Sequence, residues 1–265
     1  MTLCIVGAGA MGRWLAETVT AGPAQPTLAF ADTDAAAAAA ASAAFEDASA
    51  VELDDGMPAN EESFETVCLA VPIPVVEAAV ADWAPYAESA MLDLSGVMGA
   101  PVAAMAEHLP DRERASIHPL FAPPRAPGNV AVVGENVGPA ITPVLDALRA
   151  AGNELFETTA AEHDEAMATV QAKSHAAVLA WTLAGETVRE EFHTPVSAGL
   201  ADIAETVTEG DGRVYADVQA TFGGADDIAE AARALADADR EAFAELYAEA
   251  GTAVDDLREG PGGTR

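Results

Sequence analysis

The first 34 residues constrain the fold of this chain more than any other stretch. Residues 2–6 (TLCIV) form an apolar run typical of a buried strand, the sequence GAGAMG follows directly, and residues 13–21 have the pattern of a helix. A second apolar run, residues 27–31, ends in Asp32. A strand, a glycine turn, a helix, a second strand and a terminal acid about 20 residues beyond the last glycine are typical of a dinucleotide-binding unit.

Each part of this unit has a physical role. Gly7 allows the tight turn, Gly9 lets the backbone approach a pyrophosphate, and Gly12 lets helix and strand pack closely. The start of the helix offers free N–H groups and the positive end of the helix dipole to the phosphates. Asp32 would accept hydrogen bonds from the ribose hydroxyls and repel a 2′-phosphate, so the unit is expected to bind NAD rather than NADP.

The charge balance of the chain restricts its partners and its surroundings. The 265 residues include 44 Asp and Glu against 12 Lys and Arg, a net charge of −32, and Lys173 is the only lysine. Such a field repels nucleic acid and anionic membranes. In molar salt the screening length falls to about 3 Å and the self-repulsion largely disappears. The composition therefore favours adaptation to a salt-rich cytoplasm over an acidic partner-binding function. We expect a halophilic protein with a small-molecule substrate and no nucleic-acid or membrane partner.

Targeting and metal-binding signals are absent from the sequence. The first strand begins at residue 2, without a basic leader or a cleavage site, and the longest uncharged apolar helical stretch, residues 176–185, is far shorter than a membrane span of about 20 residues. Cys4 and Cys68 lie in apolar strand-like runs and have no metal-ligand spacing. We expect a cytoplasmic protein with reduced thiols and no metal.

Short apolar strands alternate with amphipathic helices through the first part of the chain, which predicts an α/β fold with a doubly wound, mostly parallel sheet. Ligands in such sheets bind beyond the carboxyl ends of the strands. Three segments therefore face one predicted crevice: the glycine turn, Val71-Pro72 and Ser95-Gly96. His118, at the end of a further strand, is a candidate to join them. The residues expected to hold the cofactor are Gly7, Gly9, Ala10, Met11, Gly12, Asp32, Val71 and Pro72.

From residue 161 onward the strand signal disappears and long helices are predicted at 161–189, 196–208, 212–222 and 226–251. A helix approaching 30 residues is too long for the rim of a sheet domain, so it is expected to begin a separate domain. The predicted organisation is a Rossmann domain at 1–159, a helical domain at 160–258 and a flexible tail at 259–265.

Two groups of polar residues are candidates for chemistry. His118 lies at a strand end, and histidine is the natural general base near neutral pH. Arg125, in the loop that follows, is one of few cations near the crevice and is a candidate for holding a carboxylate. At 100° per residue, Asp164, Gln171 and His175 share one face of the first long helix, either as a polar network or as part of a substrate pocket.

Several motifs occur together in a specific order. They are GAGAMG at 7–12, Val71-Pro72, LDLS at 92–95, HPLFAP at 118–123 and His163-Asp164 with Gln171 and His175. In these motifs the chain resembles the prephenate/arogenate dehydrogenase family of tyrosine biosynthesis over most of its length. The resemblance implies a Rossmann domain followed by a helical domain through which the protein forms a homodimer. It also implies oxidation of prephenate or arogenate with NAD(P)+, with loss of carbon dioxide as the ring becomes aromatic.

The resemblance also assigns roles to individual residues. His118 matches the catalytic histidine, which accepts the ring hydroxyl proton, and His175 and Gln171 match the pocket side of the helical domain. The family usually has a serine beside that histidine where this chain has Gly96, so Ser95 is the expected substitute. Ala198 stands where the family commonly has an arginine that holds a substrate carboxylate. Arg125, Arg213 or a residue from a partner subunit is expected to replace it.

Two alternatives share this architecture, a second type of dehydrogenase and a protein that is not an enzyme. A β-hydroxyacid dehydrogenase needs a catalytic lysine with an asparagine one turn further on, but Lys173 is followed by Ala176 and Ala177 at that spacing. A nucleotide-binding protein without turnover would account for the missing arginine. The sequence does not distinguish prephenate from arogenate.

Overall fold

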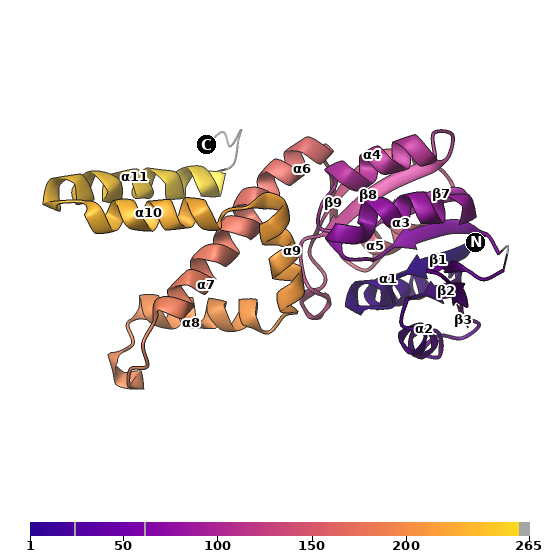
Figure 1. The fold of residues 1–265 in the computed structure, drawn as a ribbon, viewed down its shortest axis with the longest axis horizontal. Helices are drawn as coiled ribbons and strands as arrows, with labels where there is room; N and C mark the ends of the chain where they lie inside the picture. Colours follow the sequence, from indigo (N-terminus) through magenta and orange to yellow (C-terminus); the bar gives the residue numbers. More distant parts are fainter. Residues whose placement is uncertain (24, 61, 260–265) are drawn as a thin grey trace. The chain divides into compact units, whose positions relative to one another are not determined.

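The structure is a computed structural model that describes residues 1–23, 25–60 and 62–259 (Figure 1). It divides into two compact units. The first unit comprises Met1–Met167 and Arg213–Thr221, and the second comprises Ala168–Gly212 and the residues from Phe222 onward. The predicted domains 1–159 and 160–258 remain a proposal. Of the predicted tail 259–265, Glu259 ends the last helix and residues 260–265 lie outside the described residues.

The first unit is built on an eight-stranded sheet with the order β10-β9-β8-β7-β6-β1-β2-β3. All neighbouring strands are parallel except β8 and β9. This confirms the predicted doubly wound α/β fold. The strands are β1 (Thr2–Val6), β2 (Thr27–Ala31), β3 (Ser49–Ala50), β6 (Phe64–Leu69), β7 (Ala87–Asp93), β8 (Glu113–Pro119), β9 (Asn129–Glu135) and β10 (Glu154–Glu157), with a separate hairpin of β4 (Leu53–Asp54) and β5 (Met57–Pro58).

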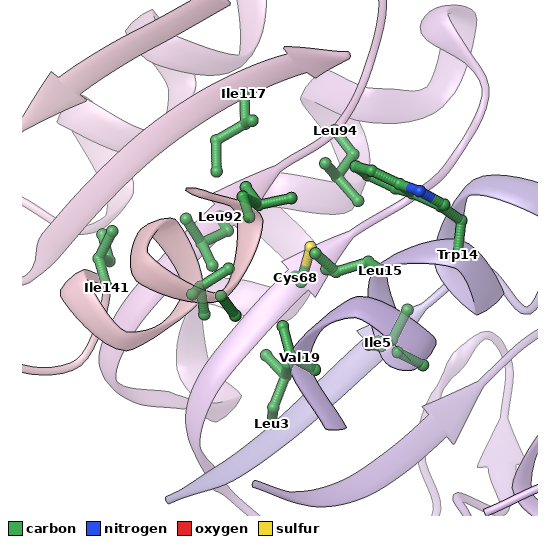
Figure 2. Close-up of a cluster of buried hydrophobic side chains, with 14 of the residues drawn as sticks. Leu3, Ile5, Trp14, Leu15, Val19, Cys68, Leu92, Leu94, Ile117 and Ile141 are labelled. Carbon is green, nitrogen blue, oxygen red and sulfur yellow. The ribbon is translucent and has the colours of Figure 1, made fainter. Parts of the chain in front are cut away.

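Side chains that alternate along the strands form the main core on one face of the sheet. Leu3 and Ile5 of β1, Leu92 of β7 and Ile117 of β8 pack there together with Leu15 and other apolar residues of three helices. Figure 2 shows these side chains converging from the sheet and from the first helix. Burial of this apolar surface holds the sheet rigid beneath its carboxyl edge. The helices are α1 (Ala10–Ala21), α2 (Ala35–Ser42) and α5 (Thr142–Ala150).

The opposite face carries α3 (Val76–Trp83) and α4 (Gly99–His108), which lie side by side (Figure 1). Because strand side chains alternate, the residues between the core positions of β7 and β8 point to this face. These are Asp93 on β7 and Ser116 and His118 on β8, and all three are buried. A second, smaller core cluster of Met98, Ala131 and Val133 packs on this side with α6 (Ala160–Met167).

The region after residue 160 is helical, as predicted, but two of the predicted long helices are each divided. The predicted helix 161–189 is divided into α6, a π-helical turn η4 (Ala168–Lys173) and α7 (Ser174–Ala184). The predicted helix 226–251 is α10 (Ala225–Asp237) and α11 (Arg240–Glu259). Asp239 separates them, because its carboxylate accepts hydrogen bonds from the N–H groups of Glu241 and Ala242 and so caps a new helix.

The remaining helices are α8 (Pro195–Thr208) and α9 (Gly212–Phe222), with short 3₁₀ turns η1 (Ile73–Val75), η2 (Ala84–Tyr86), η3 (Pro123–Arg125) and η5 (Glu190–Phe192). Within the described part of the chain, no helix combines the length and the apolar character that crossing a membrane requires.

Candidate active site

The glycine turn has the geometry that its sequence predicts. Gly7 has a φ of +105°, and a Cβ atom there would lie 2.2 Å from the carbonyl oxygen of Ala70, at the end of β6. A Cβ on Gly12 would lie 2.0 Å from the carbonyl oxygen of Gly7, so helix α1 packs directly on the turn. Only glycine fits at these two positions.

The N-terminus of α1 is open to a ligand. Gly9 is its N-cap residue, and no side chain caps the helix or places an acid in its first turn. A Cβ atom on Gly9 would meet nothing within 4 Å. The backbone N–H groups around Ala10 and Met11 therefore face open space with the positive end of the helix dipole, which is an arrangement that suits phosphate oxygens.

Asp32 lies directly beside this turn, just beyond the end of β2. Its Oδ2 accepts a hydrogen bond from the backbone N–H of Ala8 at 2.8 Å, and its Oδ1 accepts one from the N–H of Asp34 at 2.9 Å. The carboxylate is half-buried. Each oxygen keeps a further lone pair for a ligand hydroxyl, so the acid is both fixed in place and able to accept.

Segments from neighbouring strand ends lie next to one another along the carboxyl edge of the sheet, beginning at the glycine turn. Val71 and Pro72 follow the end of β6 and lead into the turn η1. A Cβ atom added at Gly96, beyond β7, would lie 3.5 Å from Cδ1 of Ile73 and 3.6 Å from Nε2 of His118. The predicted strand ends thus meet at one edge, and Nε2 of His118 faces the small space above Gly96.

His118 is held by a chain of buried hydrogen bonds. Its Nδ1 lies 2.8 Å from Nε2 of His163 on α6, and the two rings meet edge to face. Nδ1 of His163 lies 2.8 Å from Oδ1 of Asp164. The two oxygens of Asp164 also accept the backbone N–H groups of Met98 and Gly99 at 3.0 and 2.9 Å, at the start of α4.

The surroundings of this chain shift the proton affinities of its members. Burial, together with the neighbouring His163, lowers the pKa of His118 to about 3, and Asp164 partly counteracts this. Burial raises the pKa of Asp164, but the hydrogen bonds from His163, Met98 and Gly99 outweigh that effect and bring it below its usual value. At neutral pH, His118 is therefore a neutral imidazole and Asp164 is a carboxylate.

Ser95 makes contacts other than the one expected of it. Its hydroxyl is buried and lies 3.1 Å from Oδ2 of Asp93 and 2.9 Å from the carbonyl oxygen of Val97. The same Asp93 oxygen accepts the hydroxyl of Ser116 at 2.8 Å. Full burial raises the pKa of Asp93 to about 7 despite these hydrogen bonds. The Ser95 hydroxyl is therefore hydrogen-bonded to the Asp93 carboxyl. The catalytic role predicted for Ser95 stays an untested prediction.

The other predicted site residues lie in two places. Arg125 ends the turn η3 after β8 and is exposed. Gln171 lies in the π-helical turn and His175 in α7 of the second unit, and both are half-buried. Burial lowers the pKa of His175. The π turn interrupts the helix between Asp164 and His175, and the 100° spacing that predicted one shared face with Gln171 applies only to a regular α-helix.

Two further residues of the second unit bear on the alternatives. Lys173 forms an ion pair with Asp227 at 2.8 Å, as expected for a structural lysine and not for the catalytic lysine of a β-hydroxyacid dehydrogenase. Ala198 lies in the first turn of α8, which begins at Pro195 after a capping box between Thr194 and Ser197.

Comparison with known proteins identifies the family. No family model matches the chain. The chain is 31% identical over 204 residues to the 4-amino-4-deoxyprephenate dehydrogenase of Streptomyces pristinaespiralis, an alignment that covers 70% of this chain and 69% of the relative. The chain belongs to the prephenate/arogenate dehydrogenase family. The resemblance read from the sequence motifs is thereby confirmed.

Solved structures of this family share the fold. The prephenate dehydrogenase of A. aeolicus, in complex with hydroxyphenyl propionate and NAD+, superposes with a TM-score of 0.69 at 17% identity, covering 97% of both chains. The Synechocystis arogenate dehydrogenase superposes with a TM-score of 0.59 at 14% identity, covering 97% of this chain and 100% of that one. At these identities the likeness supports the fold alone.

In this member of the prephenate/arogenate dehydrogenase family, two buried residues beside the site were not predicted as functional from the sequence. His163 entered only as part of a motif, yet it contacts the ring of His118 from 45 positions away. The usable signal was the His163-Asp164 dipeptide at the start of a helix, because adjacent imidazole and carboxylate groups often form an oriented pair. Asp93 was also missed, since a single acid at the end of an apolar strand looks like an exposed terminal residue.

Proposed function

We propose that this chain is an NAD-dependent dehydrogenase that oxidises and decarboxylates prephenate or arogenate, which places it in tyrosine biosynthesis. Membership of the prephenate/arogenate dehydrogenase family supports this activity. The observation that carries it is that the open glycine turn and Nε2 of His118 lie along the same sheet edge, with Val71 to Ile73 and Gly96 between them. The turn would hold a dinucleotide at the same sheet edge as a neutral imidazole, which is the arrangement that an oxidation coupled to proton removal requires.

The residues of the first unit fit NAD. The turn of Gly7, Gly9 and Gly12, with the N–H groups of Ala10 and Met11, would hold the pyrophosphate at the open helix N-terminus. Asp32 would accept the ribose hydroxyls and exclude a 2′-phosphate. Val71 and Pro72, between the turn and His118, would line the nicotinamide end. When bound, the cofactor supplies the hydride acceptor.

His118 would act as the general base. The lone pair on Nε2 would accept the proton of the ring hydroxyl while hydride leaves the carbon atom that carries this hydroxyl. Loss of carbon dioxide and formation of the aromatic ring supply the driving force, so the protein need only orient the substrate and take the proton. Gly96 leaves space at Nε2 for the hydroxyl to approach, because its missing side chain would stand 3.6 Å away.

The substrate's carboxylates need cations or hydrogen-bond donors. We assign this role to Arg125, Gln171 and His175, since Ala198 replaces the arginine that the family commonly uses. Arg213 or a residue from a partner subunit could add a further positive charge. Each is a proposal that single substitutions would test through KM.

A second candidate substrate is the 4-amino analogue of prephenate. The relative that is 31% identical acts on 4-amino-4-deoxyprephenate. The same hydride transfer and decarboxylation apply, with the amino group in place of the ring hydroxyl. The absence of a side chain at Gly96 also leaves room for an ammonium group beside the unprotonated Nε2.

A turnover assay separates these readings. We expect the wild-type protein in molar KCl to reduce NAD+ in the presence of prephenate, arogenate or the 4-amino analogue, and to use NADP+ much less well because of Asp32. His118→Asn should lower kcat by about 10²- to 10⁴-fold, since asparagine cannot accept the proton. Equal rates for the variant and the wild type would refute the mechanism.

Cofactor binding is tested separately with glycine variants. Gly9→Ala should fold normally, since its Cβ meets nothing in the protein, but should weaken NAD+ binding because the methyl group occupies the space for the pyrophosphate. Gly251→Ala in α11, also in open surroundings, is the matched control and should bind NAD+ normally. If NAD+ binds and no substrate is oxidised, the chain is a nucleotide-binding protein without turnover.

We also propose that the chain forms a homodimer through its helical domain in a salt-rich cytoplasm. The support for dimerisation is the apolar surface of the second unit. Helix α7 has no buried residue, and Leu183 is 86% exposed, Val196 of α8 73% and Tyr247 of α11 75%. Apolar surface of this extent usually marks a protein interface. The acidic composition and the two free, buried cysteines support the location.

A further inference from the structure

The hydrogen bonds behind His118 define which nitrogen of each ring carries a proton. Asp164 is a carboxylate, and a carboxylate can only accept hydrogen bonds. Nδ1 of His163, 2.8 Å away, must therefore carry the proton of that contact. In a neutral imidazole the other nitrogen is then an acceptor. In the uncharged form of His163, Nε2 carries no proton and accepts from Nδ1–H of His118, 2.8 Å away.

The assignment leaves Nε2 of His118 without a proton. This nitrogen faces the space above Gly96, where the proposed reaction takes place. Unconstrained imidazole has a choice of two tautomers, and the wrong one would present an N–H to the substrate and could not act as a base. The backbone N–H groups of Met98 and Gly99 fix the carboxylate, and the carboxylate fixes both rings.

We propose that His163 and Asp164 are positioning residues that keep Nε2 of His118 unprotonated and then take up the positive charge when that atom accepts a proton. The inference rests on the proposed dehydrogenase function of the same site. It adds to that function a reason why a histidine so deeply buried can work as a base.

The proton transfer balances as follows. The substrate's O–H bond breaks and an N–H bond forms at Nε2 of His118, which becomes an imidazolium. The proton on Nδ1 of His118 then passes to Nε2 of His163 across their hydrogen bond. His118 is neutral again, and the cation rests on His163, 2.8 Å from the Asp164 carboxylate. One proton has left the substrate, and the pair of histidines holds one positive charge beside one negative charge.

The reason for this transfer is the cost of a buried charge. His118 is only 8% and His163 3% exposed, so a cation on either ring without a counter-ion would be strongly unfavourable. Asp164 is in contact with His163 and not with His118. Moving the charge by one hydrogen bond turns an isolated buried cation into an ion pair that is already oriented.

The tautomer assignment is testable without any catalysis. Nitrogen-15 NMR of the imidazole rings in the full-length protein should show both His118 and His163 protonated on Nδ1 and bare on Nε2. This is the minor tautomer of free histidine in water, so finding it in both rings would indicate that the hydrogen bonds impose it. In Asp164→Leu, which removes the acceptor for Nδ1–H of His163, the pattern should be lost. A proton on Nε2 of His118 in the wild type would overturn the proposal, whatever the protein's activity.

Kinetics test the second part. Asp164→Asn should lower kcat by about 10- to 100-fold. KM and NAD+ affinity should change by less than about 2-fold, since Asp164 and His163 are not assigned to ligand binding. His163→Gln keeps an acceptor for Nδ1–H but cannot take a proton, so its kcat should lie between those of the wild type and His163→Leu. Glu165→Gln, an exposed neighbour on α6, is the matched control and should leave kcat unchanged.

A double-mutant cycle distinguishes a relay from a purely structural contact. If Asp164 acts through His118, adding Asp164→Asn to His118→Asn should cost no further activity. A structural role predicts the same additional loss in both backgrounds, together with a lowered melting temperature, and that outcome would refute the inference. If the wild type oxidises none of the three substrates, the proposed function fails, while the NMR measurement still decides whether the histidines are held as described.

Discussion

At the scale of single residues, the site combines groups whose protonation is set by burial. The side chains of Asp93 on β7 and His118 on β8 project from adjacent strands to the same face of the sheet. Each contacts polar partners and is buried away from water. Burial favours the neutral form of both. For a base this is useful, because a neutral imidazole has a lone pair to offer. For Asp93 it means that the acid, which no step of the proposed reaction uses, weakens the fold once it ionises.

The pH dependence of stability follows from this shift. The pKa of Asp93 is raised from 3.8 to about 7 in the folded protein. Between these values the folded state keeps a proton that the unfolded state has lost. The contribution of Asp93 to the free energy of unfolding is therefore most favourable below 3.8 and falls as the pH rises to about 7.

Replacing Asp93 with asparagine should remove this dependence. Asparagine keeps the shape and stays neutral, and its amide N–H groups can donate to the hydroxyls of Ser95 and Ser116. In molar KCl, Asp93→Asn should be more stable than the wild type at pH 8, and the gain should be roughly 1 to 3 kcal/mol larger there than at pH 5. Urea unfolding at the two pH values measures this. The exposed Asp82→Asn is the control, and a gain that is equal at both pH values would contradict the expected cause.

At the scale of secondary-structure elements, local signals were readable and tertiary ones were not. Asp34 directly precedes α2 in the sequence, and its carboxylate caps the helix by accepting the N–H groups of Ala36 and Ala37. The Asp239 cap was overlooked because helix-forming residues continue on both sides of it. Helix caps depend on neighbours in sequence, so both were accessible in principle.

Other features of the fold depend on contacts distant in sequence. The antiparallel direction of β9 against β8 has no signature in either strand. The π turn at Ala168–Lys173 keeps the residue types of an α-helix, and only packing reveals it. The same limit applies to the site: the sequence predicted that His118 and the strand ends would meet, but not that Asp164 would be held by the first N–H groups of α4.

Helix α7 offers the sharpest test of the proposed dimer. Its sequence is apolar almost all round, yet no residue of it is buried within one chain. Such helices are usually covered by another protein surface. In molar KCl, Leu183→Asp should shift the protein from dimer toward monomer in sedimentation velocity experiments. Ala40→Asp, which adds the same charge on the exposed face of α2, should remain dimeric. A monomeric wild type at micromolar concentration would refute the proposal.

At the scale of the whole molecule, charge dominates. Ion pairs such as Arg114–Glu135, Arg149–Asp146 and Lys173–Asp227 join parts of the surface. Whatever their number, 12 cationic side chains cannot neutralise 44 acidic ones. Folding brings the excess carboxylates closer together than they are in the unfolded chain, so their repulsion opposes folding.

Salt should therefore stabilise the fold strongly. The screening length falls from about 10 Å at 0.1 M to about 3 Å at 1 M, which is shorter than most spacings between surface charges. We expect the melting temperature at pH 7.5 to rise by roughly 10 °C or more between 0.1 M and 2 M KCl, equivalent to a few kcal/mol for a chain of this size.

The salt series also distinguishes screening from other salt effects. Tetramethylammonium chloride, whose bulky cation coordinates carboxylates poorly, should stabilise the protein nearly as well as KCl if screening is the cause. A melting temperature that does not change with salt would show that the acidic surface has another role. A response to KCl alone would show that carboxylate clusters bind potassium, and the repulsion argument would then be replaced by specific ion binding to the folded state.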